Sequence, residues 1–225
     1  MLKPKKEVFR KEIERDAFLD TIDKAEANFE KNKSKYLYAA ISILIVAILS
    51  NFYLNNTEKR KNESNSSMGQ ALLALSRGDL QNAKIQFETI ISDYSGSDIA
   101  HLSNYYVGKI EFENKNYTIS DEYIRKYLQK SSNKVFIPSA YIMLSTIAND
   151  QSNDYQSAIS LLDEGIELTN DVHWLRTLKL EKARIKIRNG ENGDAKMIIN
   201  QVYNEKDLNA QEKMIAEQLL GSLAG

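Results

Sequence analysis

RGDLQNAKIQF, at Arg77–Phe87, decides the fold of this chain, because its pattern recurs at a nearly constant spacing. In it a short turn is followed by a small residue, Ala83, and then by a large apolar one, Phe87. SNDYQSAISLL, at Ser152–Leu162, repeats this frame, and two further copies follow similar turns. The small residues of the four copies lie 37, 38 and 37 residues apart: Ala83, Ser120, Ala158 and Ala195. Such a period predicts a repeat protein.

Each copy predicts a pair of antiparallel helices. A small residue lets the second helix of the pair approach the first closely, while apolar residues four and seven positions later fill the shared core. The Gly, Asn and Asp residues that precede it suit a sharp turn between the two helices. We therefore expect an all-α fold, an α-solenoid of about four helix pairs closed by a C-terminal cap helix at Ala210–Leu223.

Composition agrees with a helical chain and excludes several kinds of chemistry. The 225 residues include only two Pro and nine Gly, the residue types that break helices. There is no Cys, so thiol catalysis, Cys-based metal centres and disulfides are excluded. The formal net charge of −1 differs from the strongly basic balance of nucleic-acid-binding proteins. We expect no nucleic acid among the partners.

Few residues could carry catalysis. The two histidines, His101 and His173, each stand at the start of a predicted first helix, where a capping or partly buried role is expected. Neighbouring acids such as Asp163 and Glu164 point in different directions on a helix. The motifs of P-loop, serine-hydrolase and zinc-protease sites do not occur. We predict no enzyme activity, metal site, cofactor or small-molecule substrate.

A second feature is the uncharged run LYAAISILIVAILSNFYL at Leu37–Leu54. As a helix it would be roughly 27 Å long, close to the ~30 Å hydrocarbon core of a bilayer. Tyr36 and Phe52 stand near its ends, where an aromatic belt would lie. A buried core helix is the alternative, but the run is apolar around its circumference apart from Ser42. We predict a transmembrane signal anchor over residues 36–54 that holds the protein at the membrane through this run.

The preceding segment, residues 1–35, predicts a cytoplasmic amphipathic helix. Within residues 5–33 one face carries apolar side chains at spacings of four, three and four: Phe18, Ile22, Ala25 and Phe29, with Phe9 and Ile13 before them. Two interpretations stay open: a helix that lies on the membrane or on a partner, or a charged juxtamembrane helix without a ligand. The length of the segment argues against a cleaved signal peptide.

The basic residues beside the run predict its orientation. They are more numerous on the N-terminal side, with Lys24, Lys31, Lys33 and Lys35 against Lys59, Arg60 and Lys61. The positive-inside rule therefore favours a cytoplasmic N-terminus. After the run, residues 55–67, NNTEKRKNESNSS, contain no apolar residue and predict a flexible polar tether. The helical repeat domain is expected over residues 68–225.

The repeat resembles the tetratricopeptide repeat (TPR) over roughly Ser66–Tyr203, because a Gly or Asn-Asp-Tyr turn is followed by a small and then a large apolar residue. Ala71, Gly108 and Ala183 match the small eighth residue of the family's first helix, and Thr146 does not. This resemblance implies a superhelix whose concave groove, lined by the first helices, binds peptides or partner helices.

The family's groove positions, carried over residue by residue, fall in the second and fourth repeats: Leu102, Tyr105, Lys109 and Phe112, and Thr177, Leu180, Arg184, Ile187 and Arg188. The resemblance implies a protein-binding role for these residues, and ordinary packing between repeats is the alternative for each. The Lys and Asn pattern with which some family members clamp a peptide's C-terminal carboxylate is absent at these positions.

The whole layout resembles the ancillary Sec translocon subunits of bacterial inner membranes, TPR proteins with one N-terminal span. This resemblance implies a non-enzymatic scaffold in the inner membrane, with a cytoplasmic N-terminus and a periplasmic repeat domain. Its implied partners are translocon subunits, periplasmic chaperones or exported polypeptides. The alternative is a structural or assembly TPR protein for cell division, cell-wall or outer-membrane biogenesis.

Overall fold

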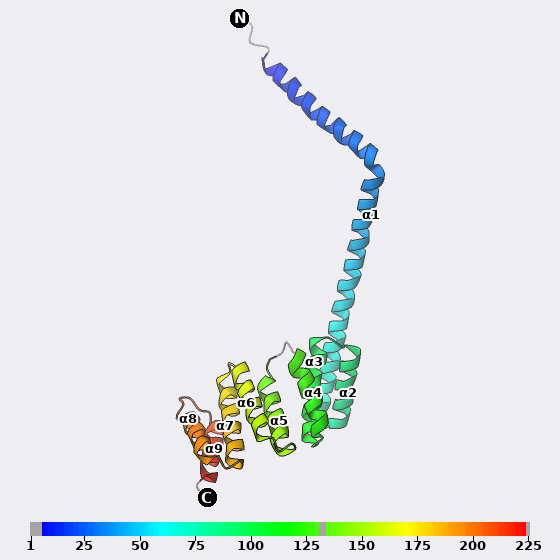
Figure 1. The fold of residues 1–225 in the computed structure, drawn as a ribbon. Coiled ribbons are helices and arrows are strands. Elements are labelled where there is room, and N and C mark those ends of the chain that lie inside the picture. The colour runs from blue at the N-terminus through cyan, green and yellow to red at the C-terminus, as the bar shows by residue number, and fades with distance from the viewer. Residues whose placement is uncertain (1–5, 131–133, 224–225) are drawn as a thin grey trace. The chain divides into compact units, whose positions relative to one another are not determined.

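The computed structural model describes residues 6–130 and 134–223, with side chains from Phe18 onward except those of Tyr53 and Lys130. Every secondary-structure element in these residues is an α-helix (Figure 1). The helices are α1 (Lys6–Ser76), α2 (Leu80–Asp93), α3 (Asp98–Glu113), α4 (Tyr117–Lys130), α5 (Ile137–Asp150), α6 (Tyr155–Leu168), α7 (Val172–Arg188), α8 (Asn192–Tyr203) and α9 (Ala210–Ser222). The chain divides into two compact units, Met1–Arg60 and Lys61–Gly225, and α1 runs through both.

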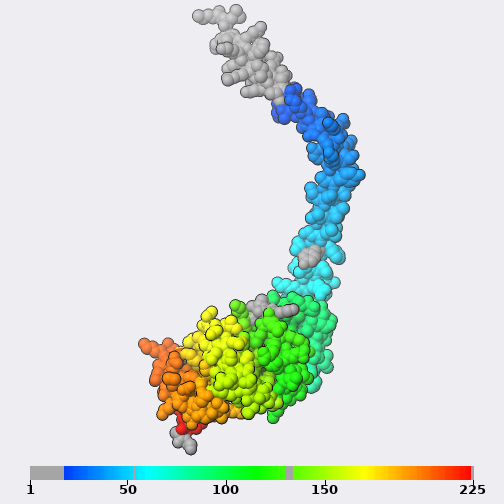
Figure 2. All heavy atoms as spheres, in the orientation of Figure 1, coloured from blue at the N-terminus to red at the C-terminus, as the bar shows by residue number. Residues whose placement is uncertain are grey.

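The repeat unit, Lys61–Gly225, contains the predicted helix pairs. The last turns of α1 share a hydrophobic core with α2, and α3 packs on α4, α5 on α6 and α7 on α8. Helix α9 packs against α7 and α8 as the cap. In Figure 2 the described residues of this unit form one continuous body from green to red. The predicted all-α fold, a solenoid of four pairs with a cap helix, is confirmed.

The turn inside each pair contains one residue in the left-handed region. These residues are Gly78, Lys115, Asn153 and Gly190, with φ of 77°, 63°, 50° and 81°. A single left-handed residue reverses the chain and lets the next N–H bond back to the preceding helix. Gly does this without strain, whereas a Lys in this conformation is unfavourable. The four turns therefore reverse the chain with the same device, one left-handed residue.

The small residues predicted to bring the helices together are all fully buried: Ala83, Ser120, Ala158 and Ala195. The second pair shows this close approach in detail. There Ser120 Oγ donates a hydrogen bond of 2.8 Å to the Gly108 carbonyl. A Cβ atom on Gly108 would lie 2.7 Å from the side chain of Ile124, closer than van der Waals contact allows. Gly108 is therefore required for this approach.

The turn of the third pair is one residue longer than the others. In the other pairs the closing N–H bonds to the carbonyl five residues earlier, but Asp154 donates to Ala148, six residues earlier, at 2.9 Å. In the second pair, Gly108 lies three residues before Glu111, whose carbonyl accepts the closing bond. In the third pair, Ser145 lies three residues before Ala148, so it corresponds to Gly108, and it is 1% exposed. The placement of Thr146 at this position is therefore wrong. The third repeat does have a small residue there, and the insertion explains the spacing of 38.

The N-terminal unit, Met1–Arg60, consists of one helix in its described residues (Figure 1). Helix α1 starts at Lys6, in agreement with the helix predicted over residues 5–33, and its backbone departs from helical values at Asn32, with φ −114° and ψ 16°. Asn32 Nδ2 donates to the Asn28 carbonyl at 3.1 Å, so the side chain competes for the acceptor of the helical hydrogen bond. The side chains of Phe9 and Ile13 lie outside the described residues.

Residues 55–67 differ from the flexible tether expected of them, because they are helical within α1. The segment contains neither Gly nor Pro, and strongly helical residues flank it on both sides, so the helix passes through it despite the Asn and Ser residues. Ser64 is only 3% exposed, and its Oγ donates to the Lys61 carbonyl at 2.9 Å. The last part of this segment therefore belongs to the repeat unit.

Candidate protein-interaction surfaces

The nine residues predicted to line a groove come from two helices, α3 and α7. Seven of them are half-buried or exposed: Leu102, Lys109 and Phe112 on α3, and Thr177, Arg184, Ile187 and Arg188 on α7. The other two, Tyr105 and Leu180, are 4% and 1% exposed. The structure therefore places both residues in the core: Tyr105 packs against the next repeat, and Leu180 packs against α8 and the cap helix α9.

Tyr105 connects the second repeat to the third. Its ring stacks on Phe136 with 4.4 Å between the centroids, and its hydroxyl lies 3.0 Å from Ser139 Oγ. Tyr106 contacts the same Phe136 ring edge-on at 5.7 Å and stacks on Phe87 at 4.9 Å. Burial raises the pKa of Tyr105, so its hydroxyl stays protonated and can donate. These rings hold α3 and α5 together.

The remaining predicted residues of α3 give the surface an apolar part, Leu102 and Phe112, and a charge, Lys109. Leu102 packs against the cores on both sides of α3 and remains half-buried. Phe112 makes an edge contact with Tyr117 at 5.6 Å between the ring centroids. Lys109 lies one turn before Glu113, with Nζ 3.9 Å from the carboxylate. An exposed ion pair of this kind contributes little to stability, so Lys109 is available to a partner.

The predicted residues of α7 are more polar. Arg184 Nη1 donates to both carboxylate oxygens of Glu181, at 2.8 and 3.0 Å. Burial raises the pKa of Glu181, although Arg184 opposes this effect. Arg188 reaches across to α5, where its Nη1 donates to Asp150 Oδ1 at 2.8 Å. Thr177 Oγ1 donates to the His173 carbonyl at 2.9 Å and so is directed to its own helix.

Helix α5 contributes residues that the sequence prediction missed. With Ser145 in the place of Gly108, the matching positions of the third repeat are Ser139, Ile142, Thr146, Asn149 and Asp150. Two contacts show that this row lies between those of α3 and α7, because Ser139 meets Tyr105 and Asp150 meets Arg188. The signal that could have revealed the row is the 38-residue spacing before Ala158. The structure therefore brings the predicted α3 and α7 residues into one surface through α5.

Two hollows lie at opposite ends of α7. A polar pocket of about 450 Å³ is lined by Asn149, Asp150, Asn153, Tyr155, Arg188 and Asn189. A smaller one of about 330 Å³ is lined by Lys134, Val135, Pro138, Leu168, Thr169, Asn170, Asp171 and Trp174. The first adjoins the α5 and α7 row and gives it three side-chain amides. Amides both donate and accept, which suits contact with a peptide backbone.

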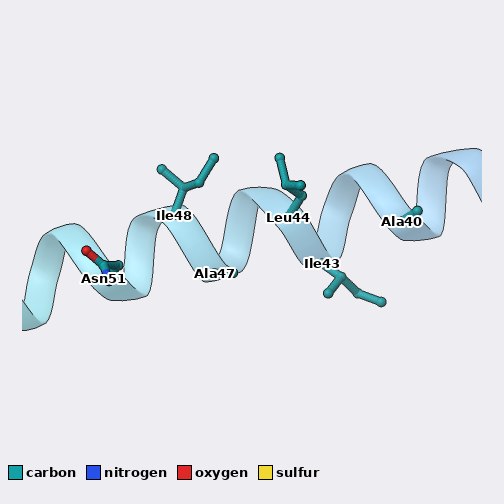
Figure 3. Close-up of a pocket in the computed structure, with 6 residues that line it drawn as sticks. All are labelled: Ala40, Ile43, Leu44, Ala47, Ile48 and Asn51. Carbon is teal, nitrogen blue, oxygen red and sulfur yellow. The ribbon is translucent and has the colours of Figure 1, made fainter.

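The apolar run of α1 is a second candidate surface. Phe18–Ser76 contains a stretch that is long and apolar enough to cross a membrane, and none of that stretch is buried. Figure 3 shows part of it, with Leu44 and Ile48 on one side of a shallow hollow and Ile43 on the other. Ile43 is 71% exposed. A core helix of a soluble protein would bury such side chains, so the run differs from the core-helix alternative.

His101 lies half-buried near the start of α3, and His173 holds a structural contact at the start of α7. His173 lies beside the N-cap Asp171 of α7, and its Nδ1 is 2.7 Å from Glu212 Oε1 on α9. Arg176 Nη1 also donates to Glu212, at 3.2 Å. Burial opposes ionisation of Glu212, but hydrogen bonds from His173 and from the Asn209 backbone outweigh it and lower its pKa. These contacts tie α7 to the cap helix. Within the described residues no group of His, Asp and Glu side chains could hold a metal ion.

The sequence matches the family model described as tetratricopeptide repeat-like domain over residues 27–171. None of the curated proteins matches the chain. Among solved structures, YrrB, described as a TPR protein with an unusual peptide-binding site, is 15% identical, with a TM-score of 0.50 over 70% of this chain and 82% of that chain. The nearly identical TPR-like repeats assigned to a Podosopora anserina kinesin light chain are also 15% identical, with 71% of this chain covered. A point variant of these repeats has a TM-score of 0.54 over 84% of that chain, and a second structure of them has 0.50 over 92%. At this identity the structures show a common fold.

Proposed function

Since the chain belongs to the tetratricopeptide repeat-like family, whose repeats form protein–protein interaction scaffolds, we propose that it is a membrane-tethered, non-enzymatic scaffold. Helix α1 would span the bacterial inner membrane through Leu37–Leu54, with the N-terminus in the cytoplasm. The repeat unit would bind its partners on the periplasmic side. These partners would be translocon subunits, periplasmic chaperones or exported polypeptides.

The observation that carries the proposal is the single surface formed by α3, α5 and α7. It combines apolar side chains, Leu102 and Phe112, with Lys109, Arg184 and the amides beside Arg188. Such a mixture suits an extended or helical protein segment, which offers both apolar side chains and backbone hydrogen-bonding groups. YrrB, a structural relative, is described as having a peptide-binding site, which supports a peptide as the kind of ligand.

Two observations support the membrane tether. The apolar run is exposed along its length, and lipid would cover such side chains. In addition, the family match starts at residue 27, before the run, and therefore includes the whole of Leu37–Leu54. The run is thus part of the matched region, together with the first repeats.

A pull-down of the full chain from mild detergent tests the partners. The informative variant combines Lys109→Glu, Phe112→Ala and Arg184→Glu on the α3 and α7 surface. The matched control changes the exposed residues Ile85→Ala on α2 and Lys196→Glu on α8. We expect the wild type and the control to recover translocon or chaperone components, and the surface variant to lose them.

Recovery of division, cell-wall or outer-membrane assembly proteins instead would favour the alternative role, a structural or assembly protein using the same repeats. Equal recovery by the wild type and the surface variant would place the binding surface elsewhere on the molecule.

An alkaline phosphatase fusion tests the orientation. The enzyme folds actively only after export, so a fusion at the end of the full chain should be active if the repeat unit is periplasmic. A β-galactosidase fusion at the same point is the control and should be inactive. The reverse pair of results would contradict the proposed topology.

A further inference from the structure

The N-terminal end of the apolar run carries three lysines without a carboxylate partner. Lys31, Lys33 and Lys35 alternate with uncharged residues, and all three are exposed. Among the described residues none of the three forms an ion pair, whereas Lys24, earlier on the same helix, lies 3.6 Å from Asp20. No Asp or Glu occurs from there to residue 57. These three positive charges are therefore left to a ligand from outside the chain.

The spacing of the lysines from the run places them at the level of lipid headgroups. Lys35, Lys33 and Lys31 come two, four and six residues before Leu37, which is roughly 3, 6 and 9 Å along a helix. The headgroup layer on each side of a bilayer is roughly 5–8 Å thick. The long side chain of a lysine lets its ammonium group reach toward this layer. All three ammonium groups can therefore meet lipid phosphates.

Two tyrosines mark the same level of the helix. Tyr36 and Tyr38 stand directly after Lys35, and both are exposed. The ring of Tyr36 stacks on that of Phe29, with 5.5 Å between the centroids. Tyrosine favours the headgroup region because its ring is apolar and its hydroxyl is polar. The two hydroxyls add hydrogen-bond donors beside the lysines.

The other end of the run has a different order of charges. The first charged residue after Leu54 is an acid, Glu58, and Lys59, Arg60 and Lys61 follow it. Glu58 lies roughly 6 Å beyond Leu54 along the helix, so a headgroup there meets a carboxylate first. Lys59 and Arg60 also interact with other groups of the chain. Only the N-terminal end offers cations alone.

The charges before the lysines favour lipid over a larger anion. Residues 18–30 contain four acids and one lysine, and the nearest acid, Glu30, comes seven residues before Leu37. An acidic protein or a nucleic acid that followed the helix beyond the lysines would be repelled by these carboxylates. A lipid headgroup stays within the layer of the three lysines and avoids them.

We infer that Lys31, Lys33 and Lys35 form a binding site for the headgroups of anionic phospholipids. The ammonium groups donate hydrogen bonds to phosphate oxygens, and the net negative charge of the lipid compensates the three cations. A zwitterionic lipid carries the same phosphate without the net charge and binds more weakly. The inference rests on the proposed membrane anchor, which fixes the lysines at this level.

The test measures which lipids surround the full chain. The purified protein is reconstituted in phosphatidylcholine vesicles with a trace of spin-labelled phosphatidylglycerol or of spin-labelled phosphatidylcholine. Electron paramagnetic resonance separates label held at the protein from label in the free bilayer, and the two fractions give the relative affinity. We expect a preference of about threefold for phosphatidylglycerol, because each lysine near the surface attracts anionic lipid. Salt at about 1 M should remove most of it.

Three sets of changes assign the preference to residues. Lys31→Gln, Lys33→Gln and Lys35→Gln together remove the charges at similar helix propensity and should bring the ratio of the two affinities close to one. The matched control changes the three basic residues at 59–61 to Gln and should keep the ratio of the wild type. Arginine at the three lysine positions keeps the charges and should also keep the ratio.

A ratio near one in the wild type would overturn the inference. A preference that survives in the lysine variant, or that both glutamine variants lose equally, would also overturn it, because the selectivity would not belong to these lysines. An alkaline wash of the same vesicles separates this inference from the proposed function. Chain released by the wash contradicts both the anchor and the lipid site, whereas retained chain with a ratio near one contradicts only the lipid site.

Discussion

The two units of this protein treat the same residue types in opposite ways. In the repeat unit, Ile124 and Leu162 are fully buried, each covered by the neighbouring helix of its pair and by the next repeat. In the Met1–Arg60 unit, Ile43 and Val46 are 71% and 65% exposed. Within the described residues of its own unit, this helix has no second helix with which to cover such side chains. The repeat unit supplies its own apolar environment, whereas the N-terminal helix finds none within its unit.

Charged residues introduced into the apolar run should have the largest effect, because they should remove the protein from the membrane and leave the repeat unit folded. Leu44→Arg and Ile48→Arg place two charges near the middle of the run, and each costs about 3 kcal/mol of insertion free energy. We expect the double variant to leave the membrane fraction, while the repeat unit keeps its unfolding transition. Alkaline extraction measures membrane retention, and the fluorescence of Trp174, on α7, measures the unfolding of the repeat unit.

The control for this prediction is Leu44→Phe with Ile48→Phe, which keeps the run apolar and should stay in the membrane. If the two-arginine variant also stays, lipid is not what covers the run.

The second prediction concerns the core of the repeat unit. Phe87 is fully buried and stacks on Tyr106, so Phe87→Ala leaves a cavity and should lower the free energy of unfolding by about 3–5 kcal/mol. Ile85 on the same helix is 59% exposed, and Ile85→Ala should change it by less than about 0.5 kcal/mol. Urea titration followed by Trp174 fluorescence compares the free energies of unfolding of the two variants. Membrane retention should not change in either variant. Equal effects would contradict the burial assigned to α2.

Lowering the pH should reduce the stability of the repeat unit without releasing the apolar run from the membrane. Glu111 is 1% exposed and accepts hydrogen bonds from Lys84 and from Asn116 Nδ2. Burial opposes its ionisation, but these bonds outweigh burial and lower its pKa below the usual 4.5. A lowered pKa means that the stability from this carboxylate is present above about pH 4.5 and is lost as the pH falls below it. The apolar run has no carboxyl group, so its membrane retention should not respond.

The measurement is the melting temperature of the repeat unit at pH 7 and at pH 4, with a shift of roughly 2–4 °C for each kcal/mol lost. Glu111→Gln keeps a hydrogen-bond acceptor but cannot titrate, so its melting temperature should depend less on pH. An equal pH dependence in the variant would assign the acid sensitivity to other carboxylates.

The comparison also explains which features could be predicted from the sequence. The four buried small residues could be predicted because each interacts mainly with its own pair, at a constant distance along the chain. The uncharged run could be predicted because its apolar character needs no tertiary contact to be recognised. The small residue in the first helix of the third repeat could not, since one residue inserted near Asn153 shifts Ser145 into the place assigned to Thr146.

Exposure at the candidate surface was less predictable. Tyr105 occupies a groove position, but Phe136 from the following connection covers its ring. That contact depends on the path of the chain between α4 and α5, which no local pattern indicates. Residues 55–67 are another case, because their Asn and Ser content suggests a coil, whereas the helices on both sides extend through them.

The smallest expected effect concerns the turns that repeat through the unit. Lys115 has φ 63° where Gly78 and Gly190 hold the matching places, and an L-residue in this region is strained by about 1–2 kcal/mol. Lys115→Gly removes the strain but gives the unfolded chain more freedom, so the net gain should be about 0.5 kcal/mol. Gly190→Ala makes the opposite change at the equivalent turn, where a Cβ has open space, and should cost about 1 kcal/mol. Urea titration measures the change in the free energy of unfolding of both variants. If the two turns share one geometry, Lys115→Gly should raise this free energy and Gly190→Ala should lower it. A loss of stability in Lys115→Gly would contradict the shared geometry.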